Sequence, residues 1–358
     1  MNLIVCRLNY DALEAVKIID NAISVIWVQR YNEAGEFELY LKATPEMLQL
    51  FSTERYIIRD DSSSIMITER VFMTTDTENG NFITVSGRSA EALLARRVAN
   101  RLYNYADINV ELLVRNLIRS TIGDQTGTER LMPIVVLGSS FGLTNTIGQI
   151  QLLGDNILDV ISSLAKTYNF GFRMQYNNTD SNMIFRVYQG TDRTFDQNTV
   201  RAVIFSPEYN NLASSEYDND KTNTKNVAYV AGEKINGIQT IVSTPTSSIP
   251  TGVARREEWI EAGDKTQKGS LTDAQYESVL RTTGNNSLSQ LRENVNFSGE
   301  VIYNTQFKYG RDYYLGDKVQ IANGYGITGS AYVTEVTEVE DETGYSIHPT
   351  LSRWSMTN

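Results

Sequence analysis

The chain has 358 residues, of which 41% are hydrophobic and 21% charged, so it is long enough for two or three domains with hydrophobic cores. No apolar run reaches the roughly 20 residues that span a membrane, and the N-terminus meets Asp11 and Glu14 before a secretion signal could form. The formal net charge of −11 leaves no general basic surface, which disfavours stable binding of nucleic acid.

The chain contains one cysteine, Cys6, and one histidine, His348. These counts exclude intrachain disulfides, Cys/His zinc sites, Cys-His dyads and most Ser-His-Asp triads. We interpret Cys6, in an apolar run, as a buried strand residue, and His348, before Pro349, as a turn or strand-end residue. The sequence therefore predicts a protein that is not an enzyme, with no catalytic residue, no metal site and no cofactor.

Residues 1–87 carry the alternating pattern of antiparallel strands. Val25 and Trp27 share a face in the first expected hairpin, and Phe37 and Leu39 alternate with polar residues in its second strand. A second hairpin follows within 65–86, with a tight turn predicted at Asn79 and Gly80. Residues 1–87 are therefore predicted to form a small antiparallel barrel or sandwich.

Residues 88–201 change to helical periodicity and are predicted to be an α+β insertion. Amphipathic helices are expected at 87–98, 109–123 and 155–171, the last with Asp155 as its N-cap. A strand pair at 171–176 and 183–188 follows the third helix.

After residue 201 the strands return. Leu271, Thr272, Gln275 and Tyr276 fit a capping box with a hydrophobic staple, which starts a helix that we expect to break at 284–287 and resume to about Asn294. Val333, Val336 and Val339 recur every third residue, which predicts a bulge or a strand buried on both sides.

The predicted fold class is α+β, mainly β: two small antiparallel β-barrels with inserted α+β and helical segments. The expected parts are a first barrel (1–87), an α+β insertion (88–201), strands of a second barrel (202–244), a polar loop and helical insertion (245–295), and the remaining strands of the second barrel (296–358).

The stretch "YGRDYYLGDKVQIANGYGI", residues 309–327, could be a reaction site or scaffold. Gly316 and Asp317 are predicted to form a turn before a strand that carries Val319 and Ile321, and a second turn is expected at 323–326. A carboxylate in such a turn usually orders the loop, so the scaffold interpretation is favoured. On this interpretation Asp317→Asn leaves assembly nearly intact, whereas Gly316→Val harms folding more if Gly316 has a positive φ.

Several segments taken together resemble the tail hub proteins of long-tailed bacteriophages. The segments are "GRSAEALLARRV" (87–98), "NVAYVAGE" (226–233), "GVARREEWIEAGD" (252–264), "FSGEV" (297–301) and "YLGDKVQI" (314–321). This family also forms the N-terminal part of tail-associated lysins and is similar to the baseplate hub of T-even phages. The resemblance implies two small β-barrels with inserted α+β parts, assembled as a trimeric ring that joins the tail tube to the distal tip and leaves a conduit for DNA ejection.

The resemblance also implies where the protein acts and with what. It implies a homotrimer at the tail tip of the virion, made in the host cytoplasm and involved in host cell attachment. Its neighbours would be the distal tail protein or tail tube proteins, and a tip fibre, spike or tape-measure protein. The family's hub part carries no catalytic residues, and the chain ends at Asn358 directly after the last expected strand, so we expect no appended lytic domain.

Two alternative functions remain open at this point. A glycoside hydrolase needs only two carboxylates about 5–10 Å apart; Glu257, Glu258 and Asp264 are the candidates, with Trp259 as a sugar platform. The neighbouring arginines at 255–256 indicate a solvated or subunit-facing charge cluster instead. A carbohydrate or receptor binder would use the 20 tyrosines, although tyrosines also stabilise sheets and subunit contacts.

Overall fold

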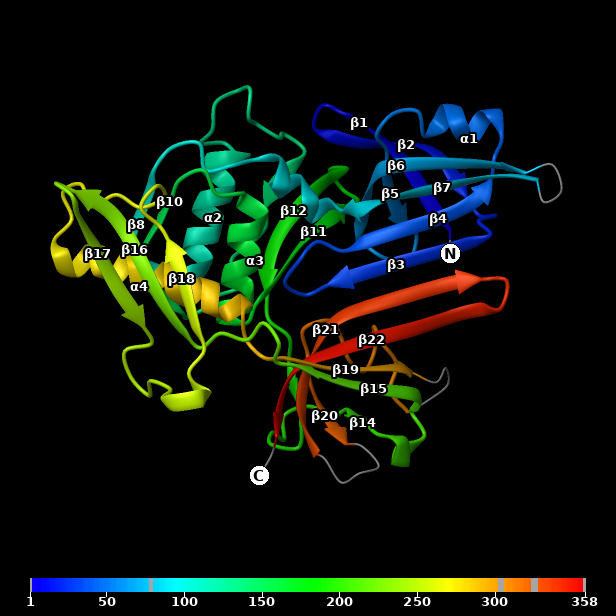
Figure 1. Cartoon of the computed structure of the whole chain (residues 1–358). Helices are drawn as coiled ribbons and strands as arrows, with labels where there is room; N and C mark the ends of the chain where they lie inside the picture. The colour runs from blue at the N-terminus through cyan, green and yellow to red at the C-terminus, as the bar shows by residue number, and fades with distance from the viewer. Residues whose placement is uncertain (1, 77–79, 302–305, 323–327, 357–358) are drawn as a thin grey trace.

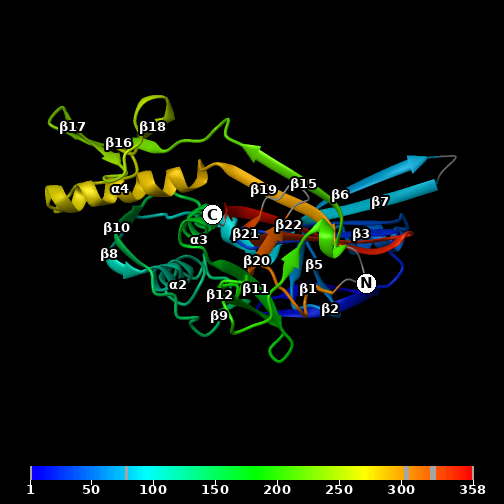
Figure 2. The ribbon, with the colours of Figure 1, turned by 90° about the horizontal axis from the view of Figure 1, so that it is seen from below.

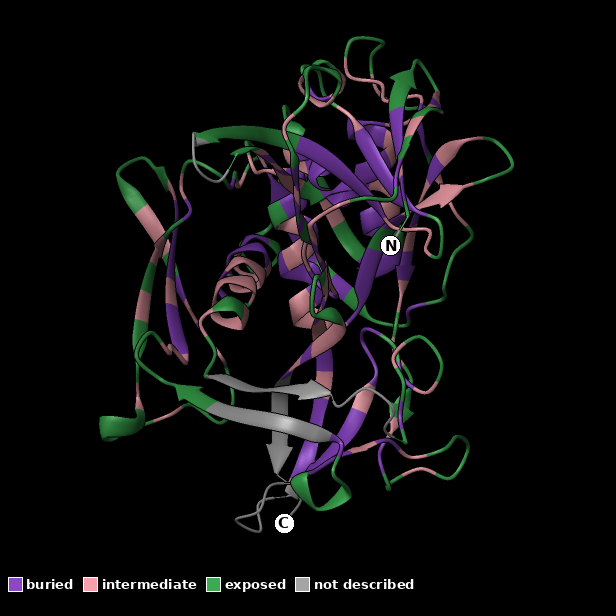
Figure 3. Cartoon of the chain, turned by 90° about the vertical axis from the view of Figure 1, so that its right-hand side faces the viewer, coloured by how far each residue is buried: buried purple, intermediate pink, exposed green. Residues whose placement is uncertain are grey.

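The structure is a computed structural model that describes residues 2–76, 80–301, 306–322 and 328–356. Within these residues the fold is mainly β with interspersed helices, as the sequence predicted. Figure 1 shows the N-terminal strands above the C-terminal strands, with a helical part beside both of them. Figure 3 shows that buried residues concentrate in the helices and inner strands, whereas loops and hairpin ends are exposed.

Seven strands and one short helix are described in the N-terminal part. They are β1 (Leu3–Asn9), β2 (Ala12–Ile19), β3 (Ser24–Arg30), β4 (Glu36–Lys42), α1 (Pro45–Leu50), β5 (Tyr56–Arg59), β6 (Ile65–Asp76) and β7 (Gly80–Ser89). Both predicted hairpins are confirmed, because β3 pairs antiparallel with β4 and β6 with β7. Asn79 of the predicted tight turn lies outside the described residues.

The core of this part follows from the alternation in β3 and β4. Val25 and Trp27 of β3 pack in one cluster with Phe37 and Leu39 of β4. Trp27 has 0% exposure, its ring centroid lies 6.2 Å from that of Phe37, and its indole N–H donates to Ser64 Oγ at 3.1 Å. The buried N–H therefore has a partner, which is the condition for placing a tryptophan in a core.

The middle part contains the predicted α+β segment. Its elements are η1 (Ala90–Arg96), β8 (Tyr103–Asn109), α2 (Val110–Thr121), β9 (Val135–Leu137), β10 (Thr146–Leu152), α3 (Ile157–Tyr168), β11 (Gly171–Asn177) and β12 (Asn182–Tyr188). β8 pairs with β10, and β11, β12 and β9 form a second small sheet. The predicted strand pair after the third helix is thus confirmed as β11 and β12.

Two details of the predicted helices are wrong. The segment 87–98 contains a short 3₁₀ helix rather than an amphipathic α-helix, because residues 90–94 are all buried and leave no polar face. The N-cap of α3 is Asn156, whose side-chain oxygen accepts from Leu158 N at 3.0 Å, rather than Asp155. The Asp155 carboxylate instead accepts from Leu153 N at 3.0 Å. Both residue types cap helices well, so the sequence could not choose between them.

The C-terminal strands form the lower part of the view in Figure 1. Together with short elements before them, they are β13 (Asp192–Arg193), β14 (Ile204–Phe205), η2 (Pro207–Tyr209), β15 (Leu212–Asp220), β19 (Asn294–Val301), β20 (Lys318–Ala322), β21 (Thr328–Asp341) and β22 (Gly344–Met356). The register of β21 against β22 shifts twice, next to Tyr332 and next to Glu335. The predicted bulge is therefore confirmed, and it lets both Val333 and Val336 be fully buried.

A third group of elements packs around one helix. It comprises β16 (Val227–Ile235), β17 (Ile238–Thr244), η3 (Gly252–Ala254), β18 (Glu257–Glu261) and α4 (Asp273–Gln290). The capping box of Thr272 and Gln275 at the start of α4 is confirmed. β16 and β17 were expected in the second barrel, but they form a separate sheet with β18, in which β18 runs parallel to β16.

The helix α4 continues through 284–287, so the predicted break is wrong. A Cβ on Gly284 would lie 2.7 Å from Thr244 Cγ2 and 2.9 Å from Val230 Cγ2. The glycine lets the helix approach β16 and β17 closely, and this packing offsets its low helix propensity. Sequence reasoning took the same residue for a breaker because the sheet that it contacts was not yet placed.

The N-terminal and C-terminal strands are joined in one hydrogen-bonded sheet. Its path runs β15-β19-β22-β21-β3-β4-β7-β6-β5-β1-β2, and β13 and β14 pair with β20, which pairs with β21. The pairing of β21 with β3 links the two ends of the chain. Two separate closed barrels were expected, but among the described strands no pair closes β2 onto β3. The prediction of a mainly β fold is therefore confirmed, but the described strand pairings show no closed barrel.

Candidate functional site

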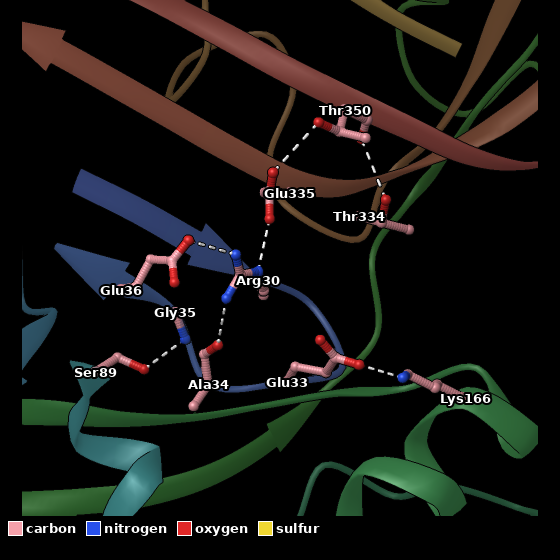
Figure 4. A network of polar contacts seen from close by, with 10 residues as sticks. All are labelled: Arg30, Glu33, Ala34, Gly35, Glu36, Ser89, Lys166, Thr334, Glu335 and Thr350. Carbon is pink, nitrogen blue, oxygen red and sulfur yellow. Dashed lines mark hydrogen bonds and ion pairs between the residues drawn. The ribbon is translucent and has the colours of Figure 1, made fainter. Parts of the chain in front are cut away.

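A group of polar contacts joins the two ends of the chain where β3 pairs with β21. Arg30, at the end of β3, lies opposite Glu335 of β21 and donates to its carboxylate at 2.6 Å. The same guanidinium donates to Glu36 at 2.8 Å and to the Ala34 carbonyl at 3.2 Å (Figure 4). One arginine thus bonds β21 to both sides of the β3–β4 turn.

The same turn also contacts the middle part of the chain. Gly35 N donates to Ser89 Oγ at 2.7 Å, and Glu33 pairs with Lys166 of α3 (Figure 4). Residues 30–36 therefore contact the N-terminal sheet, the C-terminal strands and the helical part at once. We call this turn and its partners the junction; its contacts make it a structural centre rather than a reaction site.

A second ion pair crosses from β5 to β21. Arg59 Nη1 lies 2.8 Å from Glu338 Oε1, and each side chain is only 5% exposed. Asp61 also pairs with Arg59, and Tyr345 donates its hydroxyl to Glu338. Burial disfavours the charge on Arg59, but hydrogen bonds to Asp61 and the charge of Glu338 outweigh it and raise the pKa of Arg59. Each charge of this buried pair is thus compensated by the opposite charge and by further hydrogen bonds, as a buried ion pair requires.

The stretch at 309–327 orders a turn. The Asp317 side chain, 3% exposed, accepts from Thr191 N at 2.7 Å, from Arg193 Nε at 2.6 Å and from Tyr314 N at 2.9 Å. The carboxylate thus ties the segment 191–193 to the turn before β20. The second turn expected in this stretch, at 323–326, lies outside the described residues.

The glycine of this turn is required by geometry. Gly316 has a φ of +92°, and a Cβ there would lie 2.3 Å from Cε2 of the buried Tyr31. Gly190 approaches from the other side, because its own Cβ would lie 2.0 Å from the Gly316 carbonyl carbon. The turn is therefore packed closely against the backbone of Gly190 and the ring of Tyr31. This packing leaves no room for a substrate, so the turn is part of the scaffold.

The carboxylates considered for hydrolysis do not face each other. Glu257 and Glu258 are neighbours in β18, and successive strand residues point to opposite faces of a sheet. Glu257 pairs with Arg255 at 2.5 Å, and Glu258 pairs with Lys225 at 3.5 Å. The two side chains therefore cannot flank one glycosidic bond, which a pair of catalytic carboxylates must do.

Trp259 and Asp264 do not complete such a site either. Trp259 follows in β18 with 55% of its surface exposed, and Asp264 lies in an exposed turn after the strand. Within the described residues, no group of three or more His, Cys, Asp or Glu side chains could hold a metal ion. No described helix combines the length and hydropathy needed to cross a bilayer.

The single cysteine and the single histidine both lie in strands. Cys6 in β1 is buried as predicted, and its burial raises the pKa of the thiol to about 11, which leaves it unreactive near neutral pH. His348 lies inside β22 opposite Thr337, and its Nε2 shares a hydrogen bond of 2.9 Å with Ser346 Oγ. Its interpretation as a turn or strand-end residue is therefore wrong, because β22 continues on both sides of it, from Gly344 to Met356.

An exposed hairpin extends from the N-terminal sheet, and we call residues 69–75 of its first strand the arm. β6 pairs with β5 only through residues 65–67, so beyond them its outer edge has no partner strand among the described residues. The arm carries three consecutive exposed apolar residues, Val71, Phe72 and Met73, at 40%, 50% and 40% exposure. Figure 2 shows β6 and β7 reaching past the other N-terminal strands. A free edge with apolar side chains is a typical contact surface.

Sequence reasoning missed the residues that bond the junction. Arg30, Arg59, Glu335 and Glu338 are separated by about 300 positions across the two ends of the chain, and an isolated arginine or glutamate in a strand carries no sign of its partner. Glu335 and Glu338 are three residues apart, which is also the spacing of Val333, Val336 and Val339 from which the bulge was predicted. This spacing did not indicate that Glu338 would be buried.

Comparisons with known proteins agree with this fold. The family model described as Siphovirus ReqiPepy6 Gp37-like protein matches residues 7–351. No curated protein matched the chain.

Solved tail proteins share the fold. The tail protein from Neisseria meningitidis MC58 is 12% identical, with 94% of this chain and 93% of that chain covered and a TM-score of 0.54. The 43 kDa tail protein of prophage MuSo2 from Shewanella oneidensis is 12% identical, with 98% of both chains covered and a TM-score of 0.54. The prophage tail protein gp18 from Listeria monocytogenes EGD-e is 11% identical, with 99% and 94% covered and a TM-score of 0.54.

These identities establish a shared fold, while the family model establishes membership because it spans nearly the whole chain. The resemblance to phage tail proteins that the sequence suggested is confirmed. The chain belongs to the Siphovirus ReqiPepy6 Gp37-like protein family and is built like bacteriophage tail proteins.

Proposed function

We propose that this protein is a structural component of the phage tail tip: a baseplate hub that forms a homotrimeric ring between the tail tube and the distal tip. Its family and its tail-protein fold support a structural tail or baseplate role. The ring would contact the distal tail protein or tube proteins on one side, and a tip fibre, spike or tape-measure protein on the other. The protein would thus sit in the virion at the tail tip.

The observation that carries this proposal is the arm. Among the residues that the structure describes, no strand pairs with its outer edge, which lies beside exposed Val71, Phe72 and Met73. Such an edge in a monomer invites aggregation, so natural proteins cover it with a partner. In a closed ring each arm meets the next copy through the same contact, and closure leaves no arm uncovered.

The internal arrangement of the sheet also suits a ring. Each chain contributes two β modules, one of N-terminal strands and one of C-terminal strands, joined where β3 pairs with β21. Three chains would present six modules, which is how a threefold hub can meet a sixfold tube. The junction would hold the two modules of one chain at a fixed angle, because ion pairs and strand hydrogen bonds connect them.

The charge of the chain supports a conduit at the centre of the ring. The net charge of −11 lets a lumen be lined with few lysines and arginines. DNA or a tape-measure protein would then pass with little binding by counterion release. Cryo-electron microscopy of the assembled tail tip tests this point, and a lumen lined with basic side chains would contradict the conduit while leaving the trimer intact.

We expect Phe72→Asp to break the self-association of the protein. Placing a charge on the arm would oppose burial of that edge in a contact, whereas folding would change little because Phe72 is half exposed. Light scattering coupled to size-exclusion chromatography should give a trimer for the unmodified protein and a monomer for Phe72→Asp. Val253→Asp is the matched control, because Val253 is fully exposed in η3, away from the arm, and should leave the trimer unchanged.

One result would count against the arm as the interface, and another would count against the trimer itself. One is an unaltered trimer for Phe72→Asp, which would remove the arm from the interface. The other is a sixfold or monomeric arrangement in the assembled tail tip, seen by cryo-electron microscopy. Cryo-electron microscopy of the assembled tail tip would also detect a trimer that forms only when its tail partners are present.

We further expect no hydrolysis of purified peptidoglycan by this chain. Glu257 and Glu258 point to opposite faces of β18 and each pairs with a basic side chain. Release of reducing sugars should therefore equal that of a buffer blank. Activity that disappears in both Glu257→Gln and Glu258→Gln would revive the hydrolase interpretation.

A further inference from the structure

A cavity opens between the three parts of the chain, beside the junction. Its volume is about 470 Å³, within the range of roughly 300–1,000 Å³ that is typical of small-ligand sites. One wall is the outer face of the β11–β12 pair, whose other face carries Phe172, Phe185 and Val187 in the main core. The loop at 62–64, the loop at 139–141 and the aromatic side chains of Tyr309 and Tyr314 complete the walls.

Two arginines on this wall lie side by side without an ion-pair partner. Arg173 and Arg186 are directly opposite in the β11–β12 register, so their side chains share the face toward the cavity. Neither forms a salt bridge within the described residues, although Arg173 lies over the Tyr188 ring at 4.4 Å from its centroid. Like charges at directly opposite positions destabilise a sheet, so this pair of arginines does not contribute to the stability of the fold.

The other charged residues that line the cavity are Arg30 and Glu91. Arg30 also lines the cavity, but Glu335 and Glu36 occupy its guanidinium. Glu91 is the acidic residue of the lining; it is buried, and its carboxylate accepts from Met174 N at 2.6 Å. Burial raises the pKa of Glu91, although its hydrogen bonds and the positive charge of Arg173 act to lower that pKa. In a chain of net charge −11, the cavity is therefore a local basic site.

The rest of the lining suits a polyhydroxylated ligand with flat apolar faces. Phe141 and Tyr314 line the cavity and are 50% and 46% exposed, so each ring offers exposed surface for stacking on a ligand. The guanidinium of Arg193 lies over the Tyr314 ring at 5.9 Å from its centroid, so a ligand would stack on the part of that ring that Arg193 leaves exposed. Serine hydroxyls at 62–64 and 139–140 and the Gln189 amide also line the cavity. Ser63 and Ser64 accept hydrogen bonds from within the protein, and Ser140 and Gln189 donate one each, so these side chains would use their remaining lone pairs and N–H groups for a ligand. Stacking rings beside hydroxyls and amides are the usual means of holding a sugar.

The wall that carries Phe141 is fixed in place. Glu111 at the start of α2 is buried and accepts from Ser140 Oγ and Phe141 N, both at 2.7 Å, and from Gly142 N at 2.7 Å. These bonds to the carboxylate outweigh its desolvation and lower the pKa of Glu111, so the loop stays bonded near neutral pH. The opposite loop is held by the bond from Gln175 Nε2 to Ser63 Oγ at 3.0 Å. The cavity is thus preorganised, which reduces the entropy lost on binding.

We propose that this cavity binds an anionic saccharide, that is, a sugar unit bearing a phosphate or carboxylate group. Arg173 and Arg186 would hold the anionic group by charge-assisted hydrogen bonds. Phe141 and Tyr314 would contact the sugar ring, and the serine hydroxyls would bond its hydroxyl groups. This inference goes beyond the hub role, because the cavity is formed within one chain and does not involve the arm.

Isothermal titration calorimetry on the full chain tests the proposal. Glucose 1-phosphate and glucuronate, as phosphate and carboxylate probes, should bind at least about tenfold more tightly than glucose, because each charged hydrogen bond contributes about that factor. Arg186→Gln should weaken both anions by about tenfold or more while leaving the melting temperature equal or higher, since it removes the like-charge pair. Arg255→Gln is the matched control outside the cavity and should leave binding unchanged.

Three results would overturn the proposal. The first is no binding of either sugar anion at about 10 mM, a concentration that would fill about nine tenths of a site with a Kd of about 1 mM. The second is inorganic phosphate binding as tightly as glucose 1-phosphate, which would show a general anion site without sugar contacts. The third is full binding by the Arg173→Gln/Arg186→Gln double variant, provided its melting curve shows that it is folded.

Discussion

Trp27→Asp should unfold the N-terminal strands at room temperature. Trp27 has 0% exposure, packs against Phe37, and donates its indole N–H to Ser64. The substitution removes a large buried ring and places a carboxylate in the same apolar cluster, at a combined cost of about 5 kcal/mol or more. Domains of this size are stable by about 5–15 kcal/mol, so the loss is comparable to the whole stability.

Circular dichroism and differential scanning calorimetry measure this effect. Trp259→Asp is the matched control, because it makes the same chemical change at a residue that is 55% exposed in β18. Its melting temperature should stay close to that of the unmodified protein. A thermal transition unchanged in Trp27→Asp would show that the assignment of β3 to the core is wrong.

Gly316→Val should destabilise the C-terminal strands by about 3 kcal/mol or more. Gly316 has a φ of +92°, which a β-branched residue adopts only with strain. The added Cβ would also lie 2.3 Å from the ring of Tyr31, whose burial leaves it little room to move. Gly310→Val is the control, because Gly310 has a φ of +80° but no atom within 4 Å of its Cβ position.

The difference in the free energy of unfolding between these two variants, measured by urea denaturation, gives the cost of the close contact with Tyr31 separately from the cost of the strained backbone. An equal loss in both would mean that the turn at Gly316 has more room than the structure gives it. Asp317→Asn provides the comparison at the next residue. The sequence alone predicted little loss there, but the side chain is 3% exposed, so we now expect a loss of about 2–3 kcal/mol.

The physical reason lies in the donors around Asp317. Its carboxylate accepts from Thr191 N, Arg193 Nε and Tyr314 N, and an asparagine amide would turn its own N–H groups toward some of these donors. A large effect of Asp317→Asn on stability is therefore compatible with a scaffold role.

Local patterns determined the secondary structure and the broad class of this protein. Alternation predicted the hairpins of β3–β4 and β6–β7, and helical periodicity predicted α2 and α3, because both periods reflect which face of one element is buried. The capping box at Thr272 was likewise readable, since all its partners lie within four residues. The order of several weak segments indicated a phage tail protein, which the family match confirms.

The tertiary structure decided everything that depends on partners distant in sequence. The continuity of α4 through Gly284 follows from its contact with β16 and β17, and the membership of these strands in a separate sheet follows from pairing with β18. The cavity likewise depends on distant residues, because its wall carries Arg173 and Arg186 at opposite positions of β11 and β12 and its other sides come from loops of three parts of the chain. The sequence by itself determined most of the periodic elements, the capping box of α4 and the kind of protein. Only the fold decided that Arg59 meets Glu338, that Asp317 is buried and that the arm has a free edge, because such contacts join residues whose local patterns carry no information about each other.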